Sequence, residues 1–138
     1  MRKGFLAAVI AASLFGGAAK AETYICSLKA EGRDTGWISK TIGITIDDST
    51  GQALVSDSVI LGAYKKPIAA QVVVNSPKRV SVRWEVSGEK DIRNRVYNRF
   101  MFKLTVFKSR GNKATVRAYP AGAYKQLGAA GKCELRRK

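Results

Sequence analysis

The stretch VSVRWEVS, residues 80–87, decides the fold class. Apolar side chains occupy every second position from Val80 to Val86, and polar ones occupy the positions between, from Ser81 to Ser87. A period of two is typical of a β-strand with one buried side and one side facing solvent. Most of the chain after residue 21 alternates in the same way, with no helix-period segment longer than a turn or two. We therefore expect a β fold.

Turn residues divide this alternating pattern into about eight strands. Clusters such as Asp47–Gly51 and Asn75–Lys78 contain the residues that β-turns prefer. The pattern predicts an all-β protein, a small antiparallel meander closed or nearly closed into an eight-stranded barrel of lipocalin-like size, with a β-sandwich as the alternative. The expected strands cover 24–28, 37–46, 52–56, 68–75, 80–87, 97–107, 114–119 and a last strand that contains residues 133 and 135.

The first 21 residues have the layout of a secretory signal peptide. Arg2 and Lys3 precede an apolar run over residues 5–15, and the small-x-small site Ala19-Lys20-Ala21 follows. The run is shorter than the roughly 20 residues that a membrane-spanning helix needs. We expect residues 1–21 to be removed on bacterial export. A single β domain, residues 22–138, then remains in the periplasm or outside the cell, with no transmembrane segment.

Cys26 and Cys133 stand near the two ends of this domain. An oxidising compartment favours a disulfide between them, whereas a zinc site usually takes four ligands. The bond would tie the first strand to the last, which is where an up-and-down barrel closes.

The chain contains no His, the commonest general acid–base residue near neutral pH and the commonest metal ligand. A Ser–His or Cys–His nucleophile pair is therefore excluded. The adjacent acids Asp47 and Asp48 fall in a predicted turn, where Asp is favoured for backbone reasons. We expect no catalytic residue, no metal and no cofactor, and interpret the chain as a non-catalytic binding or envelope-associated protein.

The charge is large and unevenly distributed. The chain has 25 Lys+Arg against 10 Asp+Glu, a net charge of +15. Residues 22–77 contain 5 basic and 6 acidic residues, whereas residues 78–138 contain 17 and 4. A sheet face rich in Arg and Lys attracts polyanions, and neighbouring aromatic side chains can stack on bases or sugars. The candidate anion-binding residues are Arg83, Arg99, Lys103, Arg117, Tyr97 and Tyr119.

The expected partners are anionic lipid, lipopolysaccharide, another polyanion or an acidic protein. The excess charge also has a plainer interpretation, as a solubilising surface or as protection of edge strands. In an alternative function, a barrel lined by Trp84, Phe100 and Phe102 holds a small apolar ligand. The Gly/Ala-rich stretch 121–131 is expected to be a loop, and residues 122–131 would then form a lid at the mouth of the barrel.

A secreted inhibitor of a hydrolase, acting through a loop, is a third possibility. The export signal, barrel and terminal disulfide resemble the architecture of small periplasmic inhibitors of lysozyme. The resemblance covers architecture only and includes no motif of that family. Lysozymes of that type are basic, and residues 22–138 carry a net charge of +12, which would repel them.

Overall fold

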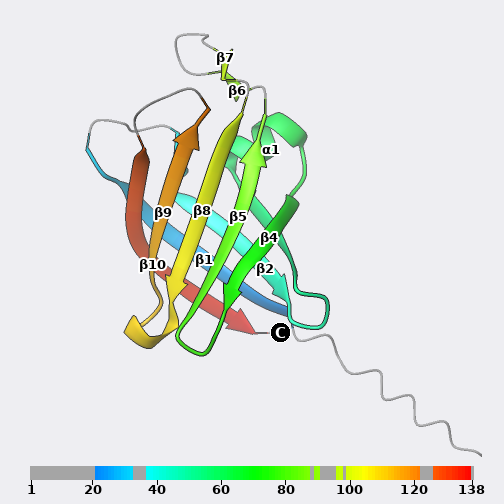
Figure 1. Ribbon diagram of the computed structural model, residues 1–138, viewed down its shortest axis with the longest axis vertical. Helices are drawn as coiled ribbons and strands as arrows, with labels where there is room; N and C mark the ends of the chain where they lie inside the picture. The colour runs from blue at the N-terminus through cyan, green and yellow to red at the C-terminus, as the bar shows by residue number, and fades with distance from the viewer. Residues whose placement is uncertain are drawn as a thin grey trace, which may run out of the picture.

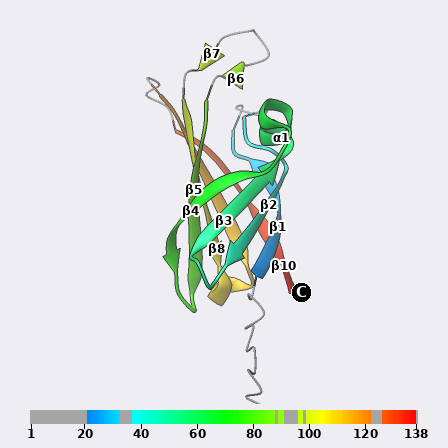
Figure 2. The same ribbon diagram turned by 90° about the vertical axis from the view of Figure 1, so that its right-hand side faces the viewer.

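The computed structural model describes residues 21–32, 37–87, 89–90, 96–97, 99–121 and 126–137. In this part of the chain, eight antiparallel strands close into a barrel in the order β1-β10-β9-β8-β5-β4-β3-β2 (Figures 1 and 2). The eight-stranded barrel predicted from the sequence is confirmed. The strands are β1 (Ala21–Ala30), β2 (Thr41–Asp47), β3 (Gln52–Asp57), β4 (Ile68–Asn75), β5 (Arg79–Val86), β8 (Phe100–Phe107), β9 (Lys113–Pro120) and β10 (Leu127–Arg137).

The core is built by the alternation that the sequence displays. In β5, the side chains at even positions from Val80 to Val86 point into the barrel and are buried. Each pairs with a buried side chain at an even position of β8, from Phe100 to Val106. Burying one such side chain contributes about 1.5–3 kcal/mol. Because successive side chains of a strand point to opposite sides, the intervening positions lie on the outer face of the barrel.

The barrel closes where β1 pairs with β10. Cys26 lies directly opposite Cys133, and their sulfur atoms are bonded at 2.05 Å, so the predicted disulfide is present at the closing seam. Gly131 lies opposite Leu28 in the same ladder. A Cβ at Gly131 would overlap the backbone carbonyl of Ser27, so the two strands approach this closely because the residue is glycine.

One helix that the sequence did not predict lies between β3 and β4. It is α1 (Ser58–Tyr64), and the carboxylate of Asp57 accepts a hydrogen bond from the Ile60 backbone N–H at 2.7 Å. Asp is among the best N-cap residues. A seven-residue helix contains only two turns, which is too short for a helical period to be recognised in the sequence.

Three strand boundaries also differ from the expectation. The stretch 121–131 is not a single loop, because β10 already begins at Leu127. The strand expected over residues 97–107 is split, since β8 begins at Phe100 and Tyr97 pairs with Glu89 in a separate ribbon of β6 (Glu89–Lys90) and β7 (Val96–Tyr97). The expected strand 37–46 is shorter, as β2 begins at Thr41. The predicted signal peptide falls almost wholly on residues 1–20, outside the described residues.

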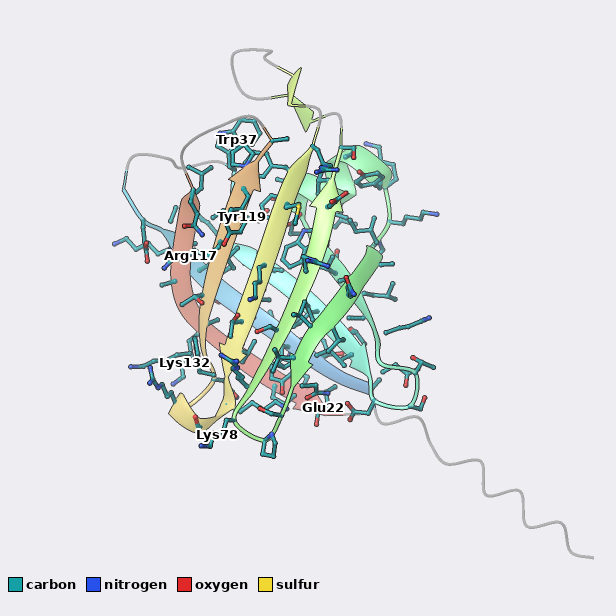
Figure 3. The ribbon with its side chains drawn as sticks, in the orientation of Figure 1. Glu22, Trp37, Lys78, Arg117, Tyr119 and Lys132 are labelled. Carbon is teal, nitrogen blue, oxygen red and sulfur yellow. A yellow bond between two sulfur atoms is a disulfide. The ribbon has the colours of Figure 1, made fainter. Side chains whose placement is uncertain are left out.

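The connections make the two ends of the barrel different (Figure 1). At the mouth end lie α1, the β6–β7 ribbon, the last residues of β1 and β9 and the first residues of β2 and β10. At the turn end, short turns follow β2 and β4, and the 3₁₀ helix η1 (Lys108–Arg110) follows β8. Trp37 covers the mouth end, where its ring stacks on Phe100 with the ring centroids 5.0 Å apart (Figure 3).

Replacing both Cys26 and Cys133 by Ala should lower the free energy of unfolding by about 4–5 kcal/mol, because the bond closes a loop of 107 residues in the unfolded chain. Urea denaturation measures the change. The reduced wild-type protein should match the double variant, which controls for the packing of the introduced Ala side chains. A loss below about 1 kcal/mol would show that the bond adds little to a seam that hydrogen bonds already close.

Asp57 should make stability depend on pH. Burial raises the pKa of its carboxyl above 3.8, against the opposing effect of its hydrogen bonds with Ile60, Val59 and Ser39. The folded protein then binds the proton more tightly than the unfolded chain, so unfolding free energy declines as pH rises from about 4 through the raised pKa. Asp57→Asn keeps an N-cap acceptor without this titration.

The stability of Asp57→Asn relative to the wild type should therefore increase between about pH 4 and pH 7. Urea denaturation at a series of pH values measures both proteins. A constant difference across that range would contradict the prediction.

Candidate functional site

Three of the predicted basic residues form one row across the outer face. Arg83 on β5 pairs directly with Lys103 on β8, and Lys103 pairs with Arg117 on β9. Directly opposed residues on antiparallel strands have Cβ atoms about 4.5–5.5 Å apart, and like charges placed in this way destabilise the sheet. We call Arg83, Lys103 and Arg117 the upper row, since it is the row nearer the mouth end.

The two outer members of the upper row are held from opposite sides. Arg83 donates a hydrogen bond to the side-chain oxygen of Gln71 on β4 at 2.7 Å. Arg117 forms an ion pair of 3.3 Å with Glu31, which follows β1. Both guanidinium groups therefore have a partner on the side away from Lys103, which lessens the repulsion within the row. Within the described residues, the ammonium of Lys103 makes no ion pair or hydrogen bond with protein.

Gly128 on β10 provides the space that Arg117 uses. It lies directly opposite Arg117, and a Cβ there would overlap the guanidinium and approach Glu31. The Arg117 side chain thus extends over the glycine to reach the carboxylate of Glu31. Figure 3 shows Arg117 and Tyr119 on the same outer side of β9.

The remaining predicted residues are placed differently. Arg99 immediately precedes β8 and lies 3.8 Å from Glu85, a contact between two exposed side chains that is worth little in stability. Tyr119 is 45% exposed and lies opposite Met101, one row closer to the mouth than Arg117. Tyr97 belongs to the β6–β7 ribbon and not to the barrel face, because its backbone pairs with Glu89. Its side chain lies outside the described part of the chain.

A second basic row lies nearer the turn end, and sequence analysis did not identify it. The paired positions Arg79–Phe107, Phe107–Lys113 and Lys113–Lys132 continue one another across β5, β8, β9 and β10. We call Arg79, Lys113 and Lys132 the lower row. The sequence alone does not predict this row, because the pairing of Lys113 with Lys132 depends on the register between β9 and β10.

The lower row has less compensation than the upper one. Among the described residues, no ion pair or side-chain hydrogen bond is made by the side chains of Arg79, Lys113 or Lys132. Two further cations, Lys108 and Arg110, follow β8 at the same end. Lys108 donates to Asn75 at 3.2 Å, and Arg110 lies over the Phe107 ring at 5.6 Å. Lys78 and Lys132 also lie toward this end (Figure 3).

The interior is occupied by stacked aromatic rings. The stack continues from Trp37 at the mouth to Phe100, Phe102 and Trp84, with successive ring centroids 5.0, 5.0 and 5.4 Å apart. Trp84 is 3% exposed, and its indole Nε1 has no hydrogen-bond partner among the residues that the structure describes. An unpaired buried donor costs about 1–3 kcal/mol.

Two hollows adjoin the barrel wall. One, of about 990 Å³, has Arg83 of the upper row in its lining, with outer-face residues such as Gln71 and Leu54 and the buried residues Ala53, Ala70 and Trp84. The other, of about 680 Å³, lies at the mouth end between the segment around Lys29 and the first residue of α1, Ser58. The lining of each includes exposed residues, so both hollows reach the surface.

The described residues include no group of three or more Cys, Asp or Glu side chains arranged to hold a metal ion. None of the described helical residues forms a helix long and apolar enough to cross a membrane. No protein-family model, curated protein or solved structure matches the chain.

Proposed function

We propose that this protein is an exported, non-catalytic binding protein whose basic outer face on β5, β8, β9 and β10 contacts an anionic polymer or surface. The observation that carries the proposal is the direct opposition of like charges. Arg83–Lys103, Lys103–Arg117 and Lys113–Lys132 are all paired positions. Such pairs are unfavourable in the free protein, and a bound polyanion would turn the repulsion into attraction.

The position of these charges argues against a merely protective role. Lys and Arg protect sheets when they lie on edge strands, where free backbone groups could pair with another chain. In the barrel, β5, β8, β9 and β10 each have a neighbour on both sides. Solubility also does not require cations to stand directly opposite one another, because charge spread evenly over the surface serves it as well.

The disulfide is an argument about the compartment in which the protein would bind its partner. A disulfide of this kind fits an extracellular or periplasmic protein. Anionic lipid headgroups, lipopolysaccharide and acidic envelope polymers are the polyanions of that compartment, and an acidic protein is a further partner with the same charge complementarity.

The first test reverses one charge in each row. Lys103→Glu combined with Lys113→Glu should weaken binding to immobilised heparin at least tenfold. It should also reduce the slope of log K against log salt by about 1.5, since each lost phosphate-type contact contributes roughly 0.7–0.9. The matched control is Lys40→Glu with Lys66→Glu, two exposed cations outside both rows. If both double variants lost the same heparin affinity, net charge alone would explain the loss, and the proposal of a specific binding face would be contradicted.

The second test works in the opposite direction. Glu31→Gln removes the carboxylate that holds Arg117, so it should strengthen heparin binding two- to fivefold and leave the fold intact, because the ion pair is exposed. Affinity measured at several salt concentrations decides the outcome. Glu22→Gln, which removes an acidic charge on β1 outside both rows, is the control for net charge. The face would not be the binding site if Glu31→Gln left the affinity unchanged or weakened it.

The alternative of an apolar ligand inside the barrel has one observation in its favour. The unpaired Nε1 of Trp84 could donate a hydrogen bond to an acceptor on such a ligand. Trp84 also lines one of the two hollows, together with the buried residues Ala53 and Ala70. The aromatic stack from Trp37 to Trp84 occupies the interior beside it, however, so a ligand deep in the barrel would compete with side chains in mutual contact. The basic face needs no such rearrangement, and we therefore prefer it.

A further inference from the structure

The space between the two basic rows has a composition of its own. The paired positions between the rows are Ser81 on β5, Thr105 on β8, Thr115 on β9 and Ala130 on β10. These four side chains are short, whereas the Lys and Arg side chains on either side are the longest on the face. We call the strip between the rows the trough. Its accessible floor consists of Thr105, Thr115 and Ala130, since Ser81 is 2% exposed. Its walls are the two basic rows, with Phe107 between Arg79 and Lys113 in the lower one.

The dimensions of the trough follow from sheet geometry. Its two walls start two residues on either side of the floor, which separates each wall from the floor by about 7 Å along the strands. Its length from β5 to β10 covers three strand spacings, about 14 Å. At the β10 end the floor row continues to Lys29 on β1, which pairs with Ala130 and adds another cation.

The floor offers hydrogen-bond donors. The hydroxyl oxygens of Ser81 and Thr105 lie 2.9 Å apart and share one hydrogen bond. Ser81 is 2% exposed, so a ligand in the trough reaches only the Thr105 hydroxyl of this pair. When Ser81 donates the shared hydrogen bond, the Thr105 proton can point into the trough. Thr115 is half-buried, and within the described residues its hydroxyl has no hydrogen-bond partner. An anion lying on the floor could therefore accept hydrogen bonds from the hydroxyls as well as attraction from the walls.

We propose that the ligand of the basic face is a single extended phosphate-bearing polymer, which lies in this trough across β5, β8, β9 and β10. This inference rests on the proposed function and narrows it. A narrow floor with donors fits one chain of tetrahedral oxyanions between two lines of cations. A membrane surface, in contrast, would meet the tips of the long side chains on a convex barrel and would leave the floor untouched.

The deciding experiment removes floor hydroxyls and keeps every charge. Thr105→Val with Thr115→Val preserves branched side chains of similar volume at two directly opposed positions. It should weaken the binding of linear polyphosphate about tenfold, since hydrogen bonds to charged groups are lost, with an unchanged salt slope. Binding to vesicles of phosphatidylcholine and phosphatidylglycerol should stay the same.

The barrel itself supplies a matched control. Thr23 and Thr45 are also directly opposed on neighbouring strands, and their hydroxyl oxygens lie 3.1 Å apart, but they lie on β1 and β2, away from both rows. Thr23→Val with Thr45→Val should leave polyphosphate binding unchanged. Thr105→Ser with Thr115→Ser restores the hydroxyls and should recover most of the affinity, which separates loss of donors from damage to the fold.

The outcomes separate the trough from the proposed function. If the variant with both Thr→Val changes binds polyphosphate like the wild type, while Lys103→Glu with Lys113→Glu does not bind, the trough proposal is wrong. The proposal that the basic face binds polyanions is then supported. Tighter binding to vesicles than to polyphosphate, with no effect of the two Thr→Val changes, also overturns the trough and favours a membrane surface. If neither ligand binds in a salt-dependent way, both proposals fail.

Discussion

The pairing of β1 with β10 is the constraint on which the rest of the structure depends. Gly131 lets the two backbones approach, and the Cys26–Cys133 bond holds them together. Because the seam is closed, each barrel strand is paired on both sides, and a slip of one residue would move a whole set of side chains from the core to the surface. The register of β10 in turn places Lys132 beside Lys113 and Gly128 beside Arg117.

Interior and exterior of the barrel thus follow from a single pattern. The even positions of β5 and β8 fill the core, and the odd positions of the same strands supply the basic rows. The core and the disulfide stabilise the fold without help from the outer face. This independence allows unfavourable pairs such as Arg83–Lys103 to persist, since a few tenths of a kcal/mol up to about 1 kcal/mol for each pair is small beside the burial of the core.

Much of the fold could be predicted from the sequence, because alternation and cysteine placement are local signals. The period of two from Val80 to Val86 identified β5 and its core face, and the two terminal cysteines predicted the closing seam. Two segments escaped prediction for physical reasons. A seven-residue helix such as α1 is too short to display a period. In β10, the residues that follow Leu127 are Gly and Ala over positions 128–131, and their small side chains carry no alternating pattern.

The candidate site was only partly predictable, since a row on a sheet is a property of register and not of any one strand. Arg83, Lys103 and Arg117 were recognised because each lies in a strand with clear alternation. Lys132 lies just beyond the stretch that had been expected as a loop, and its partner Lys113 is distant from Arg79 in the sequence. Without the register, the lower row and the floor around Thr105 could not be assembled.

The two rows differ in how far their positive charges are compensated by neighbouring residues, so the basic face attracts anions unevenly. In the upper row, Gln71 accepts a hydrogen bond from Arg83 and Glu31 forms an ion pair with Arg117, and only Glu31 supplies a negative charge. Among the described residues, Arg83 and Lys103 therefore keep uncompensated positive charges. In the lower row, three cations have no such partners among the described residues. An anion approaching the face is therefore attracted most strongly to the lower row. The guanidinium groups above it can turn inward only by exchanging a protein partner for the ligand. The lower row then supplies most of the electrostatic attraction. The upper row favours a ligand wide enough to cross the floor, because only such a ligand can take the place of Gln71 at Arg83 and of Glu31 at Arg117.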